Sequence, residues 1–383
     1  MMIWQRCIGL LACALGVQLS AWAQSTPTLD EGLHERVEMI RLPGLFPLSL
    51  ETTFFVPDGP GPFPVVIINH GKSLGDPRFQ ARARPIHAVR YFMQRGYAVV
   101  APMRRGFSKS SGMYVGAGCN IESNGRVQAD DVRAVLDHVV RQPWADTQRI
   151  LMVGQSHGGW TTLAFGTQPY PGLRGLVNFA GGLRQEQCPN WEAGLAQAAA
   201  AYGKETKLPS LWLYGDNDSY FSPAVFRPMH ERYVQAGGQA TLAAYGAFGA
   251  DAHALFASAA GVRIWHPLLN DFLRGLGLPS EPQPGFERYA PPATMPSPPP
   301  SGFAALEDAS RLPHVRDTGR AGYQAFLASI LPRAYAVAPS GAWGWASGGA
   351  DPLRRALDNC NKSGQGACRL YAVDEAVVWP APQ

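Results

Sequence analysis

The sequence at residues 150–159 reads ILMVGQSHGG and predicts a buried strand that turns directly into a helix. In a G-x-S-x-G turn, Gly154 and Gly158 let backbone segments pack closely, while the strained turn lifts the hydroxyl of Ser156 clear of the sheet. The next backbone N–H, that of His157, is then placed where a developing oxyanion needs a donor. The pattern alone also occurs by chance in glycine-rich chains, but after an apolar strand it predicts Ser156 as a nucleophile.

A serine hydroxyl reacts only when a base takes its proton, and in this type of turn the base is a histidine that follows an acid along the chain. Three histidines follow the turn within the same region of the chain. His253 lies after the last predicted strand, in a loop that leads into a helix, and is the predicted base. His230 and His266 fall in or beside helical patterns, so we expect them to pack or to lie at the surface.

The acid is expected directly after the strand at 210–214, where the sequence continues GDNDS. We predict that Asp218 is the acid, with Asp216 as the alternative. Its carboxylate should accept a hydrogen bond from Nδ1 of His253 and stabilise the imidazolium. Asp251 is close to the histidine in sequence, but we expect it to cap its own loop.

The second oxyanion donor is expected in the loop after the strand at 65–69, which ends in Asn and continues HGKS. We expect backbone N–H groups near Gly71 and Lys72 to form the oxyanion hole together with that of His157. His70 is predicted to brace this loop or to pack, rather than to act as a base.

Short β-rich runs alternate with helical patterns, which is typical of crossover units on a mostly parallel sheet. Several runs are almost continuously apolar, as expected for strands buried on both faces. The expected strands cover residues 37–42, 51–56, 65–69, 98–102, 150–153, 175–179, 210–214 and 241–245. We therefore expect an α/β fold with a mostly parallel, eight-stranded sheet flanked by helices.

The 383 residues exceed one typical domain, and a proline-rich stretch at 279–300 marks the clearest boundary. We expect a body at 24–278, a linker at 279–302 and a small α+β module at 303–383. Hydrophobic residues make up 46% and charged residues 16% of the chain, and the net charge of +4 is spread thinly. Without a basic run, we expect no nucleic-acid partner.

The small module is expected to contain two strands around a glycine-rich turn, a helix near 352–360 and a final strand that ends at Trp379. Trp343 and Trp345 alternate as on a strand. They are therefore candidates for an exposed face that binds carbohydrate, another surface or a protein partner. The alternative is that they cover the core of the module itself.

Residues 1–23 resemble a secretory signal peptide, with Arg6 before an apolar run and an AWA cleavage site at 21–23. The run is too short to span a bilayer, and no later run reaches about 18 apolar residues. We therefore expect an exported protein, periplasmic or secreted, without stable membrane insertion.

Four cysteines remain after residue 23, and in an oxidising compartment they suggest two disulfides. Three pairings are possible; proximity favours Cys360–Cys368, and the remainder gives Cys119–Cys188. Free buried thiols are the alternative. The first of these cysteines lies in a long loop, so its bridge would fasten that loop beside the site.

Five motifs, taken together, resemble the dienelactone-hydrolase-like and prolyl-oligopeptidase-like branch of the α/β-hydrolases. They are NHG at 69–71, PMRRGFS at 102–108, GQSHGG at 154–159, GDND at 215–218 and DAH at 251–253. The resemblance covers nearly the whole body and implies a triad of Ser156, Asp218 and His253, with no metal and no cofactor. True dienelactone hydrolases use a cysteine nucleophile, so a dienelactone substrate is not implied.

The leading expectation is therefore an esterase-like serine hydrolase that forms an acyl-enzyme with a small-molecule ester. A serine peptidase of the prolyl-oligopeptidase-like type is the second reading, and an inactive hydrolase-fold binding protein is the third. The tail resembles, more loosely, a small module found after such bodies in secreted bacterial proteins.

Overall fold

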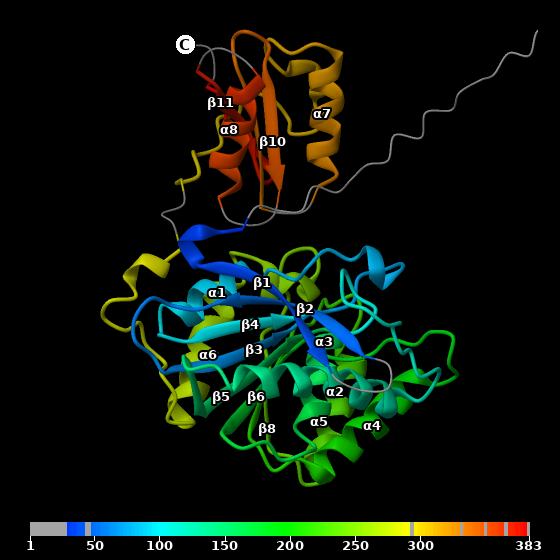
Figure 1. Cartoon of the computed structure of the whole chain (residues 1–383). Coiled ribbons are helices and arrows are strands. Elements are labelled where there is room, and N and C mark those ends of the chain that lie inside the picture. Colours follow the sequence, from blue (N-terminus) through cyan, green and yellow to red (C-terminus); the bar gives the residue numbers. More distant parts are fainter. Residues whose placement is uncertain are drawn as a thin grey trace, which may run out of the picture.

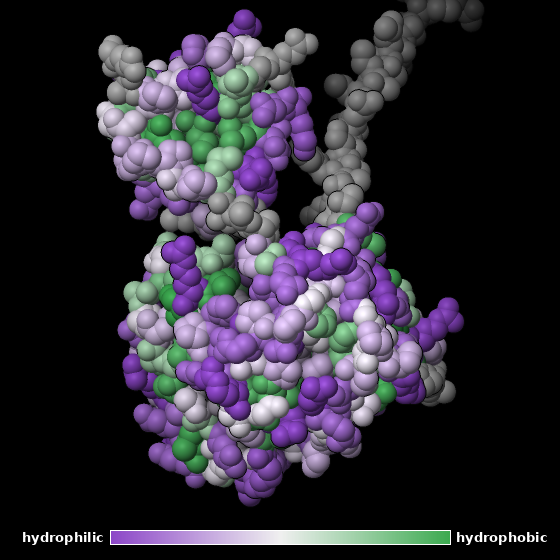
Figure 2. Space-filling model, turned by 90° about the vertical axis from the view of Figure 1, so that its left-hand side faces the viewer, coloured by the Kyte–Doolittle hydropathy of each residue, from purple (hydrophilic) through white to green (hydrophobic). Residues whose placement is uncertain are grey.

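The computed structural model describes residues 29–42, 47–291, 295–329, 332–347, 351–363 and 367–380. The expected signal peptide at 1–23 lies outside the described residues. Of the helices in these ranges, none combines the length and the apolar character needed to cross a membrane. The face drawn in Figure 2 is mostly hydrophilic, with hydrophobic residues in small patches.

The first sheet has eight strands in the order β1-β2-β4-β3-β5-β6-β7-β8. β1, β2 and β4 pair antiparallel, and the pairs from β4 to β8 are parallel. The strands are β1 (Glu35–Leu42), β2 (Leu48–Phe55), β3 (Phe63–Asn69), β4 (Ala98–Pro102), β5 (Ala145–Gln155), β6 (Leu173–Phe179), β7 (Ser210–Tyr214) and β8 (Ala240–Ala244). This architecture confirms the expected α/β fold class.

Helices cover both faces of this sheet (Figure 1). They are α1 (Ile86–Met93), α2 (Ile121–Val139), α3 (His157–Phe165), α4 (Trp191–Glu205), α5 (Pro223–Gln235) and α6 (Val262–Gly275). Side chains from α2 to α5 form one core with Val65 and Ile67 of β3, whereas those of α1 and α6 form the other with Val66 and Ile68. Burial of alternate residues on opposite faces explains why β3 is apolar from Phe63 to Ile68.

The first part of the proline-rich stretch packs against the unit that contains the first sheet. Arg95 donates to the carbonyl of Ser280, and the Tyr97 hydroxyl donates to that of Pro279. Tyr289 is 1% exposed in the core beside α1 and α6, and its hydroxyl accepts from the N–H of Asp58. Residues 279–290 thus pack on the first unit, because buried aromatic contacts hold a segment that its proline content marks as a linker.

The second unit is a four-stranded antiparallel sheet in the order β10-β9-β11-β12, orange to red in Figure 1. Its elements are α7 (Asp317–Leu327), β9 (Arg333–Val337), β10 (Trp343–Ser347), α8 (Pro352–Ser363), β11 (Arg369–Val373) and β12 (Ala376–Val377). The sequence pattern does not predict α7, and it predicts a single strand where the structure has β11 and β12. A turn with Asp374 at φ 52° separates these two strands.

The two tryptophans of β10 pack mainly within this unit. The ring of Trp343 stacks on Tyr335 with centroids 6.0 Å apart, and it also lies against Gly319 and Gly322 of α7. Trp345 is partly buried against the same core. These contacts fit the alternative that both residues cover the core of their own module.

Candidate active site

The turn between β5 and α3 has the strained geometry expected of a nucleophile elbow. Ser156 has φ 57° and ψ −125°, in the left-handed half of the backbone map that a residue with a side chain rarely adopts. A Cβ on Gly154 would lie 2.1 Å from the carbonyl oxygen of Gly158, and one on Gly158 would lie 2.1 Å from that of Asn69. Only glycines at both positions let β3, β5 and α3 approach this closely.

His253 and Asp218 form a hydrogen-bonded pair beside this turn. Nδ1 of His253 lies 3.1 and 3.0 Å from the two carboxylate oxygens of Asp218, whose side chain is fully buried. The carboxylate also accepts the backbone N–H groups of Tyr220 and Phe221. These bonds fix its orientation, so the imidazole is held with Nδ1 toward the acid and Nε2 available to another group.

Ser156 and His253 line the same pocket, which has a volume of about 360 Å³. The pocket is lined by Gly71, Lys72, Ser73, Gln80, Gln155, Ser156, Tyr220 and His253. The ring of Tyr220 lies over the imidazole, with centroids 4.5 Å apart. The predicted nucleophile and base, which are 97 residues apart in sequence, therefore meet at the carboxyl edge of the parallel strands.

Asp216, the alternative acid, is exposed, and its N–H donates to the carbonyl of Gly246. Asp251 accepts from the N–H of His253 and from Ser219, so it caps the loop as expected. His230 instead bonds the carbonyl of Ala240 on the edge strand. Asp216, Asp251 and His230 are all absent from the pocket lining.

The fourth candidate, His266, packs on α6 against Tyr91 and accepts a hydrogen bond from Arg95. It too is absent from the pocket lining. The packing or surface role expected for His230 and His266 fits these contacts.

The loop after β3 contributes Gly71 and Lys72 to the pocket, where their backbone N–H groups were expected. His70 braces this loop: its Nε2 accepts the N–H of Arg104, so Nδ1 carries the proton and donates to the carbonyl of Gly71 over 2.7 Å. Burial and the Arg104 charge hold the pKa of His70 well below its ordinary value. His70 is therefore a neutral brace.

Gln80 also lines the pocket, although no sequence pattern predicts it there. Its side chain donates to the carbonyl of Gly71 over 3.0 Å and accepts the N–H of Ser73 over 2.8 Å. It thereby ties together the two ends of the segment from Gly71 to Ser73 in the loop after β3. An isolated glutamine between two loops carries no sequence signal, and only the fold brings it to the pocket. Gln155, which also lines the pocket, directly precedes Ser156 and could have been found from the sequence.

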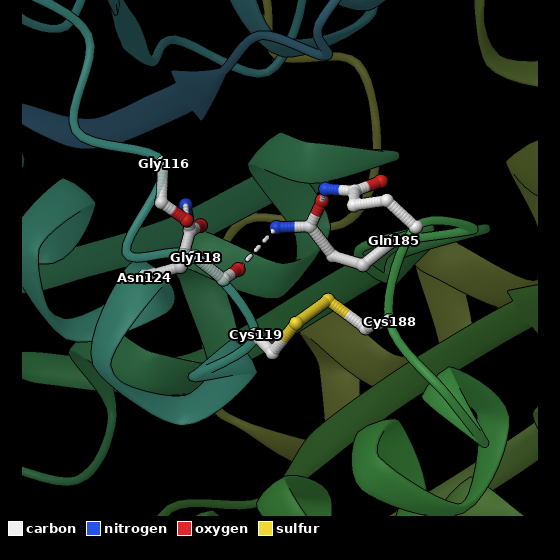
Figure 3. Close-up of a disulfide and its surroundings, with 7 residues drawn as sticks. Gly116, Gly118, Cys119, Asn124, Gln185 and Cys188 are labelled. Atoms are coloured by element: carbon white, nitrogen blue, oxygen red, sulfur yellow. Dashed lines mark hydrogen bonds between the residues drawn. A yellow bond between two sulfur atoms is a disulfide. The ribbon is translucent and has the colours of Figure 1, made fainter.

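The predicted disulfide Cys119–Cys188 is formed, with Cα atoms 5.6 Å apart, and so is Cys360–Cys368. Figure 3 shows Cys119 and Cys188 joining the loop before α2 to the loop after β6. The amide of Gln185 donates to the carbonyl of Gly118 beside the bridge. The side-chain amide of Asn124 donates to the carbonyl of Gly116, so the segment before Cys119 is also held by two hydrogen bonds from side chains.

Residues 48–219 match the family described as X-Pro dipeptidyl-peptidase (S15 family). An acylaminoacyl peptidase in complex with Z-Gly-Gly-Phe-chloromethyl ketone is similar in structure, with 18% identity, a TM-score of 0.51, and coverage of 67% of this chain and 44% of that chain. The uncomplexed acylaminoacyl peptidase of Pyrococcus horikoshii gives 18% identity, a TM-score of 0.50, and coverage of 67% and 44%. This chain has the α/β-hydrolase fold.

A puromycin-hydrolysing peptidase of Mycobacterium tuberculosis is also similar, with 21% identity, a TM-score of 0.46, and coverage of 64% of this chain and 39% of that chain. The α/β-hydrolase chain described here thus spans less than half of the length of these three peptidases. No curated protein matches it. The family match and the arrangement of Ser156, His253 and Asp218 together support a serine hydrolase.

Proposed function

We propose that this protein is an exported serine hydrolase that cleaves small carboxylic esters through an acyl-enzyme on Ser156. The observation that carries the proposal is the hydrogen bond between Nδ1 of His253 and the buried Asp218, because His253 shares a pocket with a serine held at φ 57°. A structural loop needs neither a strained serine nor a buried acid–imidazole pair.

The reaction follows from these positions. Nε2 of His253 takes the hydroxyl proton as Oγ of Ser156 attacks the ester carbonyl, and the carbonyl oxygen becomes an oxyanion. The backbone N–H groups of Gly71 or Lys72 and of His157 would stabilise this charge. The imidazolium then gives its proton to the alcohol as the ester C–O bond breaks. The alcohol departs, and the acyl group remains bonded to Oγ of Ser156.

Hydrolysis repeats the same steps with water. His253 removes a proton from the water, the hydroxide attacks the acyl carbonyl, and the proton returns to Oγ of Ser156 as the carboxylic acid leaves. Asp218 stays ionised throughout and stabilises the imidazolium in both halves of the cycle.

A serine peptidase is the second candidate, and the match to the X-Pro dipeptidyl-peptidase family favours it. The same triad and oxyanion hole would then act on an amide. We also propose that the protein belongs to the dienelactone-hydrolase-like and prolyl-oligopeptidase-like branch of the α/β-hydrolases. Membership of that branch is compatible with cleavage of either an ester or a peptide bond.

Export is the third part of the proposal. Two disulfides support an oxidising compartment, since the cytosol keeps most thiols reduced. The test is the mature N-terminus of the exported protein, which we expect directly after residue 23. A protein found only in the cytosol with residues 1–23 retained would contradict it.

Trp345 packs partly against the core of its own unit, but it also lines a depression. We propose that the C-terminal unit binds a carbohydrate surface there. This depression of about 1090 Å³ is lined by His314, Arg316, Trp343 and Trp345, among others. Aromatic rings beside polar groups suit sugar rings, which have one apolar face. Retention of the protein on insoluble polysaccharides should fall in Trp345→Ala, whereas equal retention of the variant would contradict this role.

The enzymatic proposal is tested with a fluorophosphonate probe and two substrate panels. We expect the probe to label wild-type protein on Ser156, and we expect turnover of short p-nitrophenyl acyl esters that Ser156→Ala abolishes without loss of folding. Retained turnover in that variant, or an unlabelled wild-type protein, would overturn the assignment. Faster turnover of X-Pro p-nitroanilides than of the esters would favour the peptidase.

A further inference from the structure

Arg104 is a fully buried cation directly behind the oxyanion hole. Its side chain is 0% exposed, and its guanidinium donates to the carbonyl of His70 over 2.9 Å and to Oε1 of Gln128 over 3.0 Å. It also lies 3.1 Å from Nδ1 of His157. One arginine thus contacts both segments that carry the proposed oxyanion donors, the loop after β3 and the first residue of α3.

The charge of Arg104 has no carboxylate partner among the described residues. Asp131, on the neighbouring helix α2, pairs instead with Arg105 at 2.5 Å. Nη1 of Arg104 is buried without a hydrogen-bond partner in the described part of the chain. Burial lowers the pKa of Arg104 to about 10, so the side chain stays charged at neutral pH. A buried, unpaired cation is expensive, which makes a purely structural role a poor explanation.

The contact with His157 shows how this charge is connected to the site. Nδ1 of His157 accepts from Arg104, so the proton sits on Nε2, which donates to Oδ1 of Asn124 over 2.7 Å. Burial, together with the charge of Arg104, holds the pKa of His157 well below its ordinary value. Both nitrogens of the neutral imidazole are therefore hydrogen-bonded. These bonds fix the position of His157, whose backbone N–H is a proposed oxyanion donor.

We propose that Arg104 is a positioning residue that holds both oxyanion donors in place. Its positive charge also makes the site around these donors more favourable for a developing negative charge. This inference rests on the proposed function at Ser156. Fixed charges and dipoles aimed at the site of developing charge act strongly where water is excluded, and they need no reorganisation during the reaction. The tetrahedral oxyanion gains from this field, whereas the neutral substrate gains little.

The decisive experiment neutralises the charge without moving it. In Gln128→Glu, an isosteric carboxylate would replace the amide oxygen 3.0 Å from Nε of Arg104 and would form a buried ion pair. Only the weak bond from Gln128 to the carbonyl of Val115 is lost, at 3.3 Å. We expect kcat for p-nitrophenyl esters to fall about tenfold or more, KM to change less than about threefold, and the thermal midpoint not to fall.

A matched control exists at a second buried arginine. Arg95 is 1% exposed, and it donates to the carbonyl of Ser280 and to Oδ1 of Asn270 over 3.1 Å, outside the pocket lining. Asn270→Asp introduces the same ion pair there. We expect this variant to keep the wild-type kcat.

A boronic acid inhibitor supplies a second readout, because its adduct with Ser156 is tetrahedral and anionic. Its inhibition constant should rise in Gln128→Glu by about the same factor as kcat falls, and it should stay unchanged in Asn270→Asp. Arg104→Met, which removes the charge and the hydrogen bonds together, should lose at least as much kcat per folded molecule as Gln128→Glu.

The outcomes distinguish a failure of the role proposed for Arg104 from a failure of the function proposed for Ser156. Wild-type kcat in Gln128→Glu, or an equal loss in Asn270→Asp, overturns the role of Arg104 while the proposed function stands. Wild-type protein that neither turns over esters nor binds the boronic acid overturns the function of Ser156, and this inference with it. If Arg104→Met does not fold, Gln128→Glu still decides the question.

Discussion

Two aspartates lie two residues apart in one loop, but only Asp218 contacts His253. Asp218→Asn should lower kcat about ten-thousand-fold, because an amide in that place favours the wrong imidazole tautomer and cannot stabilise the imidazolium. Asp216 is exposed, so Asp216→Asn should retain kcat within about threefold. Steady-state kinetics on a p-nitrophenyl ester measure both values. A larger loss in Asp216→Asn would exchange the two roles.

Glu35 of β1 makes the acid stability of the fold depend on one buried carboxylate. Its side chain is fully buried and accepts hydrogen bonds from Arg82 and Arg84. Burial raises the pKa of Glu35, but the bonds from Arg84 and Arg82 outweigh burial, so the net pKa lies below its ordinary value of 4.5. The stabilisation is therefore complete above pH 4.5 and is lost as the pH falls below it.

Glu35→Gln should lower the free energy of unfolding at pH 7 by about 3 kcal/mol, because it leaves two partly or fully buried arginines without their acid. As the pH falls below 4.5 and Glu35 becomes protonated in the folded state, the difference between the variant and the wild type should shrink. Urea unfolding between pH 3 and 7 measures this. Glu38→Gln is the control, since Glu38 and Arg36 form an exposed pair, and it should cost less than about 1 kcal/mol. A constant difference at every pH would contradict the role of Glu35.

At the scale of elements, the Cys119–Cys188 bridge closes a loop with a sequence separation of 69 residues. The double variant Cys119→Ala/Cys188→Ala should lose about 4 kcal/mol of unfolding free energy, because the unfolded chain regains the entropy of that loop. Urea unfolding under oxidising conditions measures the change. The Cys360–Cys368 bridge closes a loop with a sequence separation of only 8 residues. The double variant Cys360→Ala/Cys368→Ala should therefore lose only about 2–3 kcal/mol of unfolding free energy. Equal stability of the first variant and the wild type would show that hydrogen bonds alone hold the loop.

Most elements of the first sheet were predictable because their apolar runs are local signals. The structure lengthens β5 to begin at Ala145, because residues before the expected start pair with Phe63 and Pro64 of β3 through a shifted register. Such pairing depends on a neighbouring strand and leaves little trace in the strand's own sequence. Helix α7 was missed for a related reason: Gly319 and Gly322 weaken its helical pattern, yet they are needed where Trp343 packs against it.

At the scale of the whole molecule, the core of the first unit is completed by a segment far along the chain. Tyr289→Ala should lower the unfolding free energy by about 3 kcal/mol or more, because a buried ring and its hydrogen bond to Asp58 are lost. The neighbouring Arg288→Ala keeps the Tyr289 ring, breaks an exposed ion pair with Asp58, and should cost less than about 1 kcal/mol. Chemical denaturation of both full-length variants compares them. A cost of less than about 1 kcal/mol in Tyr289→Ala would contradict the contribution of Tyr289 to this core.

The sequence by itself determined the order of the strands along the chain and the candidates for nucleophile, base and acid, because a strained turn, an apolar strand and a loop after a strand are local features. The tertiary structure decided which of these candidates meet. It separated Asp218 from Asp216, brought Gln80 to the loop after β3 and buried Arg104 against the same loop. These choices depend on contacts between residues that are distant in sequence, and only the packed sheet with its helices fixes such distances.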